Sequence, residues 1–151
     1  MDMAEGTMLP RDVLTGNAIH TIDAKGRIVV PSKFRDALGY VVFATRSPDG
    51  CIRLYPEFHY LRMLDKLCKG DVSKTALRRR ISGRAEQLRI DSQGRLLVPE
   101  AMRLAAGITD KVCMVGMVEW LELWDETALA EAEAQLSDEE AERMMAELGM
   151  A

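Results

Sequence analysis

Short apolar runs separated by polar turns occupy most of this chain, and one such pattern occurs twice. Residues 23–31 read DAKGRIVVP, and residues 91–99 read DSQGRLLVP. Both copies have the form D-x-x-G-R followed by three aliphatic residues and a proline. Matches spaced so regularly in two places indicate a duplicated supersecondary unit. We therefore expect two copies of one local fold.

Each copy is predicted to contain strands, tight turns and a short helix. Asp followed three residues later by Gly is typical of a turn, because the Asp side chain accepts backbone N–H groups and Gly adopts positive φ at no steric cost. Alternating and β-branched residues favour strands beside this turn, and Pro31 favours the start of a helix that Gly39 ends. In the first copy, the predicted elements are a strand at 17–22, a buried strand at 28–30, a helix at 32–38, and a hairpin with strands at 40–45 and 51–55.

Two helices are predicted between the copies. Pro56 begins a segment with apolar residues at near-helical spacing, which Gly70 ends. Ser73 is positioned to cap a second helix over 74–81, which Gly83 ends. The copies are therefore expected to be joined by a helical connector.

A helical tail is predicted after the second copy. Asp125 is expected to cap a helix that runs through Leu136. Ser137 and Glu140 have the spacing of a capping box for a last helix through Leu148. The apolar stripe of this tail is thin, which favours a helix that covers the connector or a neighbouring subunit over a recognition helix.

The duplicated pattern resembles a known bacterial family. The D-x-x-G-R core, with its proline and then Arg35 or Arg103, looks like the AbrB-type swapped-hairpin domain of transcription regulators. Two tandem copies, closed by Leu-Tyr-Pro and by Glu-Leu-Trp-Asp, make residues 15–128 similar to the MraZ family. The resemblance implies an α+β, mainly β fold, namely a pseudo-twofold double-split β-barrel made of two tandem repeats with flanking helices.

Chain length agrees with two interlocked repeats. The chain has 151 residues and can bury a sizeable core, whereas a single repeat of about 70 residues would be marginally stable alone. The predicted organisation is a disordered N-terminal extension at 1–14, an AbrB-like repeat at 15–58, a helical connector at 59–83, a second AbrB-like repeat at 84–127 and an acidic helical tail at 128–151.

Composition indicates the cellular compartment in which we expect the protein. Apolar residues make up 48% of the chain, which excludes a disordered protein, and no apolar run approaches the ~18 residues of a membrane span. The first ten residues lack the apolar stretch of a secretion signal. Three cysteines without C-x-x-C spacing favour small buried thiols in a reducing compartment. We expect a cytoplasmic protein, and the family resemblance implies that it is associated with the nucleoid.

Charge is segregated along the chain. The net charge is −4, but residues 119–151 contain eleven acids and one base, Arg143. Residues 1–118 therefore contain nineteen bases and thirteen acids, a net charge of +6. The repeats are basic although the whole chain is acidic, so the total charge does not exclude nucleic acid as a partner.

The basic side chains of the repeated turns are the first candidates for DNA contact. Arginine on a rigid turn loses little entropy on docking and can form paired hydrogen bonds with guanine. Arg27 and Arg95 could equally pair with Asp23 and Asp91 to hold the turns, and the residues alone leave both interpretations open. The family resemblance favours DNA. The predicted DNA-binding residues are Lys25, Arg27, Arg95 and, more weakly, Lys33; the predicted structural residues of the turns are Asp23, Gly26, Asp91 and Gly94.

Other arginines are candidates for phosphate or subunit contacts. Arg35 and Arg103 occupy matching positions on the short helices, where an inter-repeat or intersubunit salt bridge is favoured over phosphate contact. The run Arg78, Arg79 and Arg80 lies between the repeats and favours oligomer or phosphate contacts over base reading.

Enzymatic chemistry is not expected. The two histidines, His20 and His59, share no motif and have no acid at metal-binding spacing. The chain has no glycine-rich phosphate loop, G-x-S-x-G elbow or H-E-x-x-H motif. We expect no catalytic residue, no cofactor and no metal site.

The resemblance implies a DNA-binding transcription regulator that represses the promoter of its own operon of division and cell-wall genes. Such proteins are ring-shaped homo-oligomers, which would present many basic turns to direct repeats in double-stranded DNA. The alternative is a protein-binding scaffold or antitoxin-like module without catalytic activity. Salt separates the two hypotheses, because DNA binding weakens steeply as counterions are added.

Overall fold

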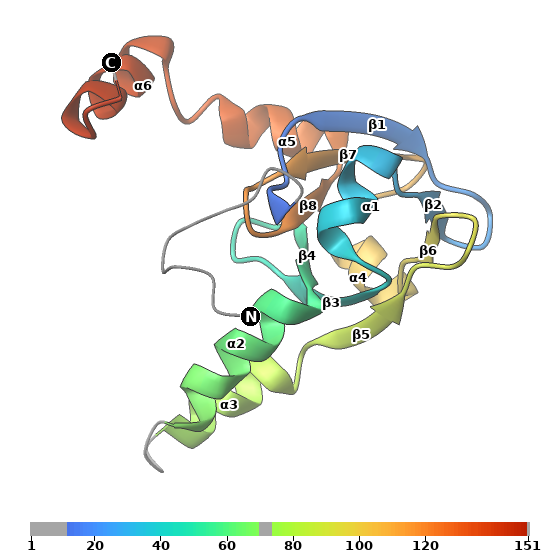
Figure 1. Cartoon of the computed structure of the whole chain (residues 1–151). Coiled ribbons are helices and arrows are strands. Elements are labelled where there is room, and N and C mark those ends of the chain that lie inside the picture. The colour runs from blue at the N-terminus through green and yellow to red at the C-terminus, as the bar shows by residue number, and fades with distance from the viewer. Residues whose placement is uncertain (1–11, 70–73, 151) are drawn as a thin grey trace.

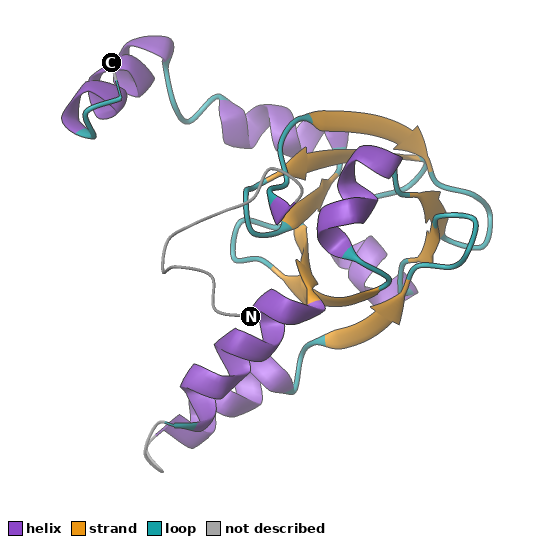
Figure 2. Cartoon of the chain, viewed as in Figure 1, coloured by secondary structure: helices purple, strands orange, loops and turns teal. Residues whose placement is uncertain are grey.

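The computed structural model describes residues 12–69 and 74–150, and its elements fall into two similar halves joined by helices (Figures 1 and 2). The first half contains β1 (Asn17–Thr21), β2 (Arg27–Val29), α1 (Ser32–Leu38), β3 (Val41–Arg46) and β4 (Ile52–Pro56). The connecting helices are α2 (Glu57–Cys68) and α3 (Thr75–Ser82). The second half contains β5 (Glu86–Arg89), β6 (Arg95–Leu97), α4 (Glu100–Ala105), β7 (Lys111–Gly116) and β8 (Leu121–Trp124), followed by α5 (Glu126–Glu133) and α6 (Asp138–Glu147).

Strands of the two halves are interleaved in the sheets. Within the described residues, a six-stranded antiparallel sheet has the order β1-β7-β8-β4-β3-β5, and β2 pairs with β6 in a separate two-stranded ribbon. The pairs β1–β7, β8–β4, β3–β5 and β2–β6 each join one half to the other. Neither half can therefore complete a sheet by itself.

The larger sheet is open. Its edge strands, β1 and β5, are not paired with each other anywhere in residues 12–69 and 74–150. Each edge strand instead leads through a turn into the β2–β6 ribbon, which lies at one side of the molecule (Figure 1). The predicted α+β class is confirmed, whereas a closed barrel is not.

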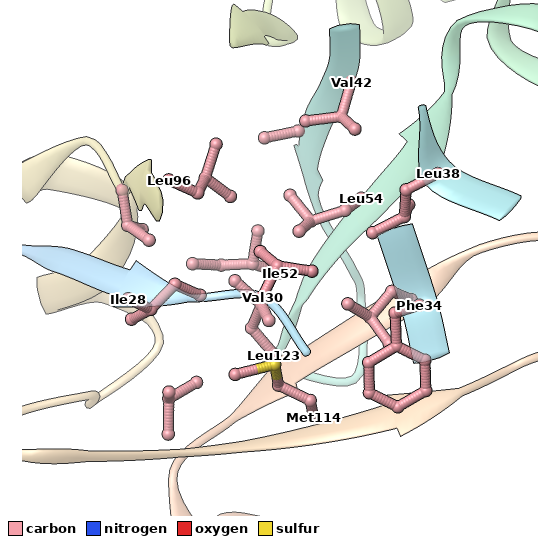
Figure 3. Packing of buried hydrophobic residues seen from close by; sticks show 14 of the residues in the cluster. Ile28, Val30, Phe34, Leu38, Val42, Ile52, Leu54, Leu96, Met114 and Leu123 are labelled. Atoms are coloured by element: carbon pink, nitrogen blue, oxygen red, sulfur yellow. The ribbon is translucent and has the colours of Figure 1, made fainter. Parts of the chain in front are cut away.

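The hydrophobic core lies between the ribbon and the sheet (Figure 3). Ile28 and Leu96 point into it from the ribbon and are 1% and 0% exposed. Side chains alternate along a strand, so the neighbours of Ile28 face outward. The prediction that the whole run 28–30 is buried is accordingly wrong for Val29, which is 45% exposed.

Side-chain caps define the starts of the two tail helices, α5 and α6. The Asp125 carboxylate accepts the Ala128 N–H at 3.0 Å, and Ser137 and Glu140 form the predicted capping box. An N-cap residue needs an extended backbone, so α5 cannot continue into Ser137 and ends at Glu133, before the predicted Leu136. The predicted boundary residues Gly70 and Ser73 lie outside the described residues.

Two further expectations need correction. Leu14 is buried and exchanges backbone hydrogen bonds with Val118 at 2.8 and 2.9 Å, so the folded core begins before residue 15. Cys51 and Cys113 are buried, and burial raises the pKa of Cys51 to about 12, but Cys68 is exposed on α2. A thiol near the end of a surface helix is not covered by the sheet, which the cysteine count could not reveal.

We predict that residues 15–70 expressed alone give a disordered or self-associated product. The fragment would leave β1, β2, β3 and β4 without their partners from the second half. Circular dichroism, amide proton dispersion and mass by light scattering would test this, with the full chain as the control. A well-folded monomeric fragment would contradict the prediction.

Candidate nucleic-acid interface

The first repeated turn is held by one carboxylate. Asp23 Oδ1 accepts the backbone N–H groups of Lys25 and Arg27, both at 2.9 Å. Asp23 Oδ2 accepts Arg27 Nε at 2.8 Å. The turn is closed further by the Gly26 N–H, which donates to the Asp23 carbonyl at 3.0 Å. Asp23 thus organises the backbone and positions the arginine at the same time.

The second turn repeats these bonds. Asp91 Oδ1 accepts the N–H groups of Gln93 and Arg95 at 2.8 and 2.9 Å, and Oδ2 accepts Arg95 Nε at 3.0 Å. The pairing of each arginine with its aspartate, one of the two interpretations from the sequence, is therefore present. A guanidinium has five N–H donors, so a bond from Nε does not prevent contact with another group.

Both aspartates stay ionised at neutral pH. Hydrogen bonds, first that from the Arg27 backbone N–H, lower the pKa of Asp23 below its ordinary value. The Arg95 backbone N–H has the same leading effect on the pKa of Asp91. Carboxylates with a lowered folded pKa stabilise the fold above their unfolded pKa, and this stabilisation is lost as pH falls through the folded value. The contribution of Asp23 and Asp91 to the stability of the fold is therefore fully present near neutral pH and is lost in acid.

Each turn is also covered by an arginine from the other repeat. A Cβ atom on Gly94 would lie 2.7 Å from Arg35 Nη1, and one on Gly26 would lie 3.4 Å from Arg103 Nε. Among the described residues, the ion pairs include neither Arg35 nor Arg103, so the inter-repeat salt bridge expected of them is not present. Their contact does cross between repeats, but it is made to a glycine turn because strand exchange brings that turn beneath the guanidinium.

Arg35 and Arg103 each have one hydrogen-bond donor without a partner among the described residues. The Nε atoms of Arg35 and Arg103 are buried and have no hydrogen-bond partner within residues 12–69 and 74–150. Buried polar atoms of this kind usually bind something, for example water or an anion. Since these Nε atoms are buried, any phosphate contact of Arg35 or Arg103 would be made by the other guanidinium nitrogens.

The outer face of the ribbon combines basic and apolar side chains. Arg27 pairs with Leu97, and Val29 pairs with Arg95, so these four residues share the face opposite Ile28 and Leu96. Leu97 is 55% exposed. Sequence reasoning missed Val29 and Leu97, because three consecutive aliphatic residues follow each arginine and hide the in–out alternation that a strand imposes. The face has the dimensions of a two-stranded ribbon, which can enter the DNA major groove.

Lys33 lies apart from this face. Its Nζ donates to the Asn17 carbonyl at 2.6 Å and lies 5.1 Å from the centroid of the Phe34 ring. Asn17 begins β1, whereas the Asp23 turn follows the end of β1. The structure thus does not bring Lys33 together with Lys25 and Arg27.

The arginine run of the connector is also separate. Arg78, Arg79 and Arg80 are exposed on α3, which projects from the sheet away from the ribbon (Figure 1). Arg80 lines a cavity of about 760 Å³ together with Arg84, four residues further along the chain, and with Arg46 of β3 and Arg53 of β4. Sequence reasoning missed this group, because Arg46 and Arg53 meet the connector only in the folded chain.

The two repeated turns differ in charge. Lys25 in the first turn is replaced by Gln93 in the second, while the aspartate and arginine are shared. The first turn therefore carries one more positive charge than the second. Lys25 is exposed and available to a ligand.

The described residues contain neither a candidate metal cluster nor a candidate membrane-spanning helix. No cluster of three or more His, Cys, Asp or Glu side chains in residues 12–69 and 74–150 could hold a metal ion. In the same residues, every helix is too short or too polar to cross a bilayer.

Interleaved tandem repeats with Asp-anchored basic turns place the chain among duplicated α+β proteins. A family model described as "MraZ protein, putative antitoxin-like" matches residues 13–80 and again 81–148. The chain belongs to the MraZ family.

Relatives in this family carry one functional name. Proteins named transcriptional regulator MraZ from Bordetella pertussis and Paraburkholderia xenovorans are 38% and 37% identical over 125 and 129 residues. The matches cover 80% and 82% of this chain and 87% and 90% of the relatives. A Finegoldia magna relative of the same name is 37% identical over 109 residues, 70% of this chain and 76% of its own length. The family is thus one of transcription regulators and not an enzyme class.

We predict that Gly94→Ala destabilises the protein more than Gly39→Ala does. Both glycines have positive φ, of 77° and 72°, but a Cβ at residue 39 meets nothing within 4 Å. Gly39→Ala should cost about 1–2 kcal/mol for the left-handed backbone, and Gly94→Ala should cost about 1–3 kcal/mol more for displacing Arg35. Urea unfolding gives both free energies.

An Arg35→Ala background provides the control for that comparison. The extra cost of Gly94→Ala should disappear there, because the displaced guanidinium is gone. Equal costs of Gly94→Ala in both backgrounds would show that Arg35 moves aside freely.

Proposed function

We propose that this protein is a DNA-binding transcription regulator that represses the promoter of its own operon of division and cell-wall genes. The observation that carries the proposal is the outer ribbon face, where Arg27 and Arg95 are positioned by identical Asp-anchored turns. The family name supports the regulatory role, and the operon follows from the family resemblance.

Each residue of the face has a distinct part in this proposal. Arg27 and Arg95 contact base edges or phosphates, and their Nε bonds to aspartate limit the entropy lost on binding. Lys25, Arg35 and Arg103 contact phosphates beside the turns, with Lys33 at the periphery. Val29 and Leu97 offer apolar surface to thymine methyl groups.

Self-assembly completes the mechanism. One ribbon with a few cations would bind DNA weakly, whereas a ring-shaped homo-oligomer presents several ribbons to direct repeats. After the first ribbon binds, the next binds at high effective concentration, so affinity rises without new types of contact. Arg78, Arg79 and Arg80 on α3 are available for contacts between copies or with phosphate.

The remaining features of the proposal concern organisation and location. We infer that the open sheet and the ribbon together are this chain's form of the double-split barrel. The repeats are assigned to 15–58 and 84–127, the connector to 59–83 and the tail to 128–151. A promoter-binding role places the protein in the cytoplasm, associated with the nucleoid.

A scaffold or antitoxin-like role is the second candidate, because the family description itself contains the words antitoxin-like. Such a module would hold a protein partner and would not need the ribbon cations. Binding to the DNA upstream of the gene, measured from low to moderate salt, separates the candidates. A DNA-binding protein loses affinity in proportion to the phosphates it neutralises.

We predict that Arg27→Ala abolishes specific promoter binding, with a loss of at least about tenfold per contacted repeat, while fold and assembly persist. The side chain is one-third exposed and has no apolar role. Fluorescence anisotropy on promoter and scrambled DNA measures the effect. Arg143→Ala, the loss of the lone base of the tail, is the matched control and should bind normally. Loss of secondary structure or of oligomer mass in Arg27→Ala would instead show that Arg27 stabilises the structure of the turn.

We predict that truncation after Ser137 leaves affinity for a single-repeat DNA fragment unchanged or slightly raised. Residues 119–151 are strongly acidic, and α6 lies on the other side of the molecule from the ribbon (Figure 1). Truncation removes residues 138–151, with five acids and one base, and so lessens long-range repulsion of phosphate. Titrations at fixed salt measure the affinity. Lost binding to the single repeat, by a sample of unchanged oligomer mass, would place the tail in the DNA interface.

A further inference from the structure

Helix α6 is amphipathic, and nothing in residues 12–69 and 74–150 covers its apolar face. Ala141, Met144, Met145 and Leu148 follow the i, i+3, i+4, i+7 spacing of one helical face. Met144 is 48% exposed and Leu148 is 75% exposed. The tail is expected to cover either the connector or a neighbouring subunit, and the first alternative is not observed for α6, which projects from the body apart from α2 (Figure 1). Its remaining surface is acidic, with five acids and one base between 138 and 147.

Helix α5 provides a contrast within the same tail. Its Ala128, Leu129 and Ala132 pack against Trp124 and the buried cysteines of the sheet. The apolar residues of α5 thus pack within the chain, whereas Met144, Met145 and Leu148 of α6 are exposed. The tail is anchored through α5 and presents α6 outward.

A groove of matching chemistry lies between α2 and α3. It has a volume of about 320 Å³ and is lined by Met63 and Leu67 of α2 and by Leu77 and Ile81 of α3. Lys66 and Lys74 also line it, at positions that expose their ammonium groups. Leu77 is 45% exposed, so the apolar lining is open to a ligand.

The charges of the groove and of α6 are opposite. Three consecutive arginines, Arg78 to Arg80, are exposed on α3, which contains no acid. A helix that inserts apolar residues at i, i+3, i+4 and i+7 into an apolar groove is a common mode of recognition. The acidic surface of α6 would then face the lysines and arginines around the groove, which favours encounter and orientation.

We propose that α6 of one copy docks into the α2–α3 groove of a second copy. Figures 1 and 2 show α6 and the α2–α3 pair projecting from different parts of the body, which favours a neighbouring copy over the same chain. This contact rests on the self-assembly in the proposed function and specifies how it occurs. It is heterologous, since helix and groove are different surfaces, and a heterologous contact that closes on itself produces a ring.

Two variants test the two surfaces separately. Met144→Glu/Leu148→Glu alters only the tail, and Leu77→Glu alters only the groove. Sedimentation velocity should show oligomers for the wild type and monomers for each variant at the same concentration. The exposed Leu104→Glu on α4 is the matched control, since Leu104 is 60% exposed but belongs to neither surface, and should assemble normally. Circular dichroism establishes that each variant is folded.

Mixing the two variants gives the decisive measurement. The tail variant keeps an intact groove and the groove variant keeps an intact tail, so an equal mixture should form heterodimers that neither forms alone. A mixture that stays monomeric would overturn the proposal. Weakened assembly in only one of the two variants would also overturn it, because the helix or the groove would then have another partner, such as a second α6 or a different protein.

Cysteine cross-linking checks the contact without disrupting it. In a Cys68→Ser background, a Leu77→Cys copy and a Met144→Cys copy should cross-link on mild oxidation. Glu139→Cys, on the opposite face of α6, should cross-link at least about tenfold more slowly in place of Met144→Cys. Equal yields for residues 139 and 144 would contradict docking of the apolar face.

The DNA role is tested independently by the affinity of the tail variant for single-repeat DNA. Retained salt-dependent binding by a monomeric tail variant would support both proposals together. A monomeric wild type that binds DNA would overturn the docking proposal and the proposed ring, and would leave the DNA-binding role in place. Assembly as described in a protein without DNA affinity would overturn the proposed function and leave the contact between copies in place.

Discussion

Backbone pairing between the two halves is the constraint on which the rest of the structure depends. The Val30 N–H donates to the Gly94 carbonyl at 2.8 Å, and the Val98 N–H donates to the Gly26 carbonyl at 2.9 Å. Each turn is therefore closed by its own aspartate but held in place by the opposite repeat. The same exchange brings Ile28 and Leu96 into one core and puts Arg27 and Arg95 on one outer face.

Features determined by near neighbours could be predicted from the sequence. The Asp-x-x-Gly turns, the Asp125 cap and the Ser137–Glu140 capping box each depend on residues within four positions of one another. The duplication also predicted the order of elements in both halves. Such features are local, so a linear pattern contains most of the information that specifies them.

Features that depend on strand exchange could not be predicted in the same way. Arg35 covers a turn that is distant in sequence, and the cavity arginines Arg46 and Arg53 meet Arg80 only in the folded chain. The sequence suggested a salt bridge for Arg35 because charge and helix position were visible, whereas the glycine beneath it was not. The pairing of β2 with β6 determines that contact, and this pairing is tertiary.

The difference between Lys25 and Gln93 bears on the orientation in which the ribbon would bind a DNA duplex. With equal turns, a ribbon of approximate twofold symmetry would meet a duplex equally well in either orientation. The extra charge of the first turn removes this equivalence, so the two ends of the ribbon would attract the phosphates of a bound duplex unequally. A ribbon bound in the proposed way would thereby acquire a polarity along the DNA axis. Copies arranged head to tail would all point the same way, as tandemly repeated sites of one orientation require.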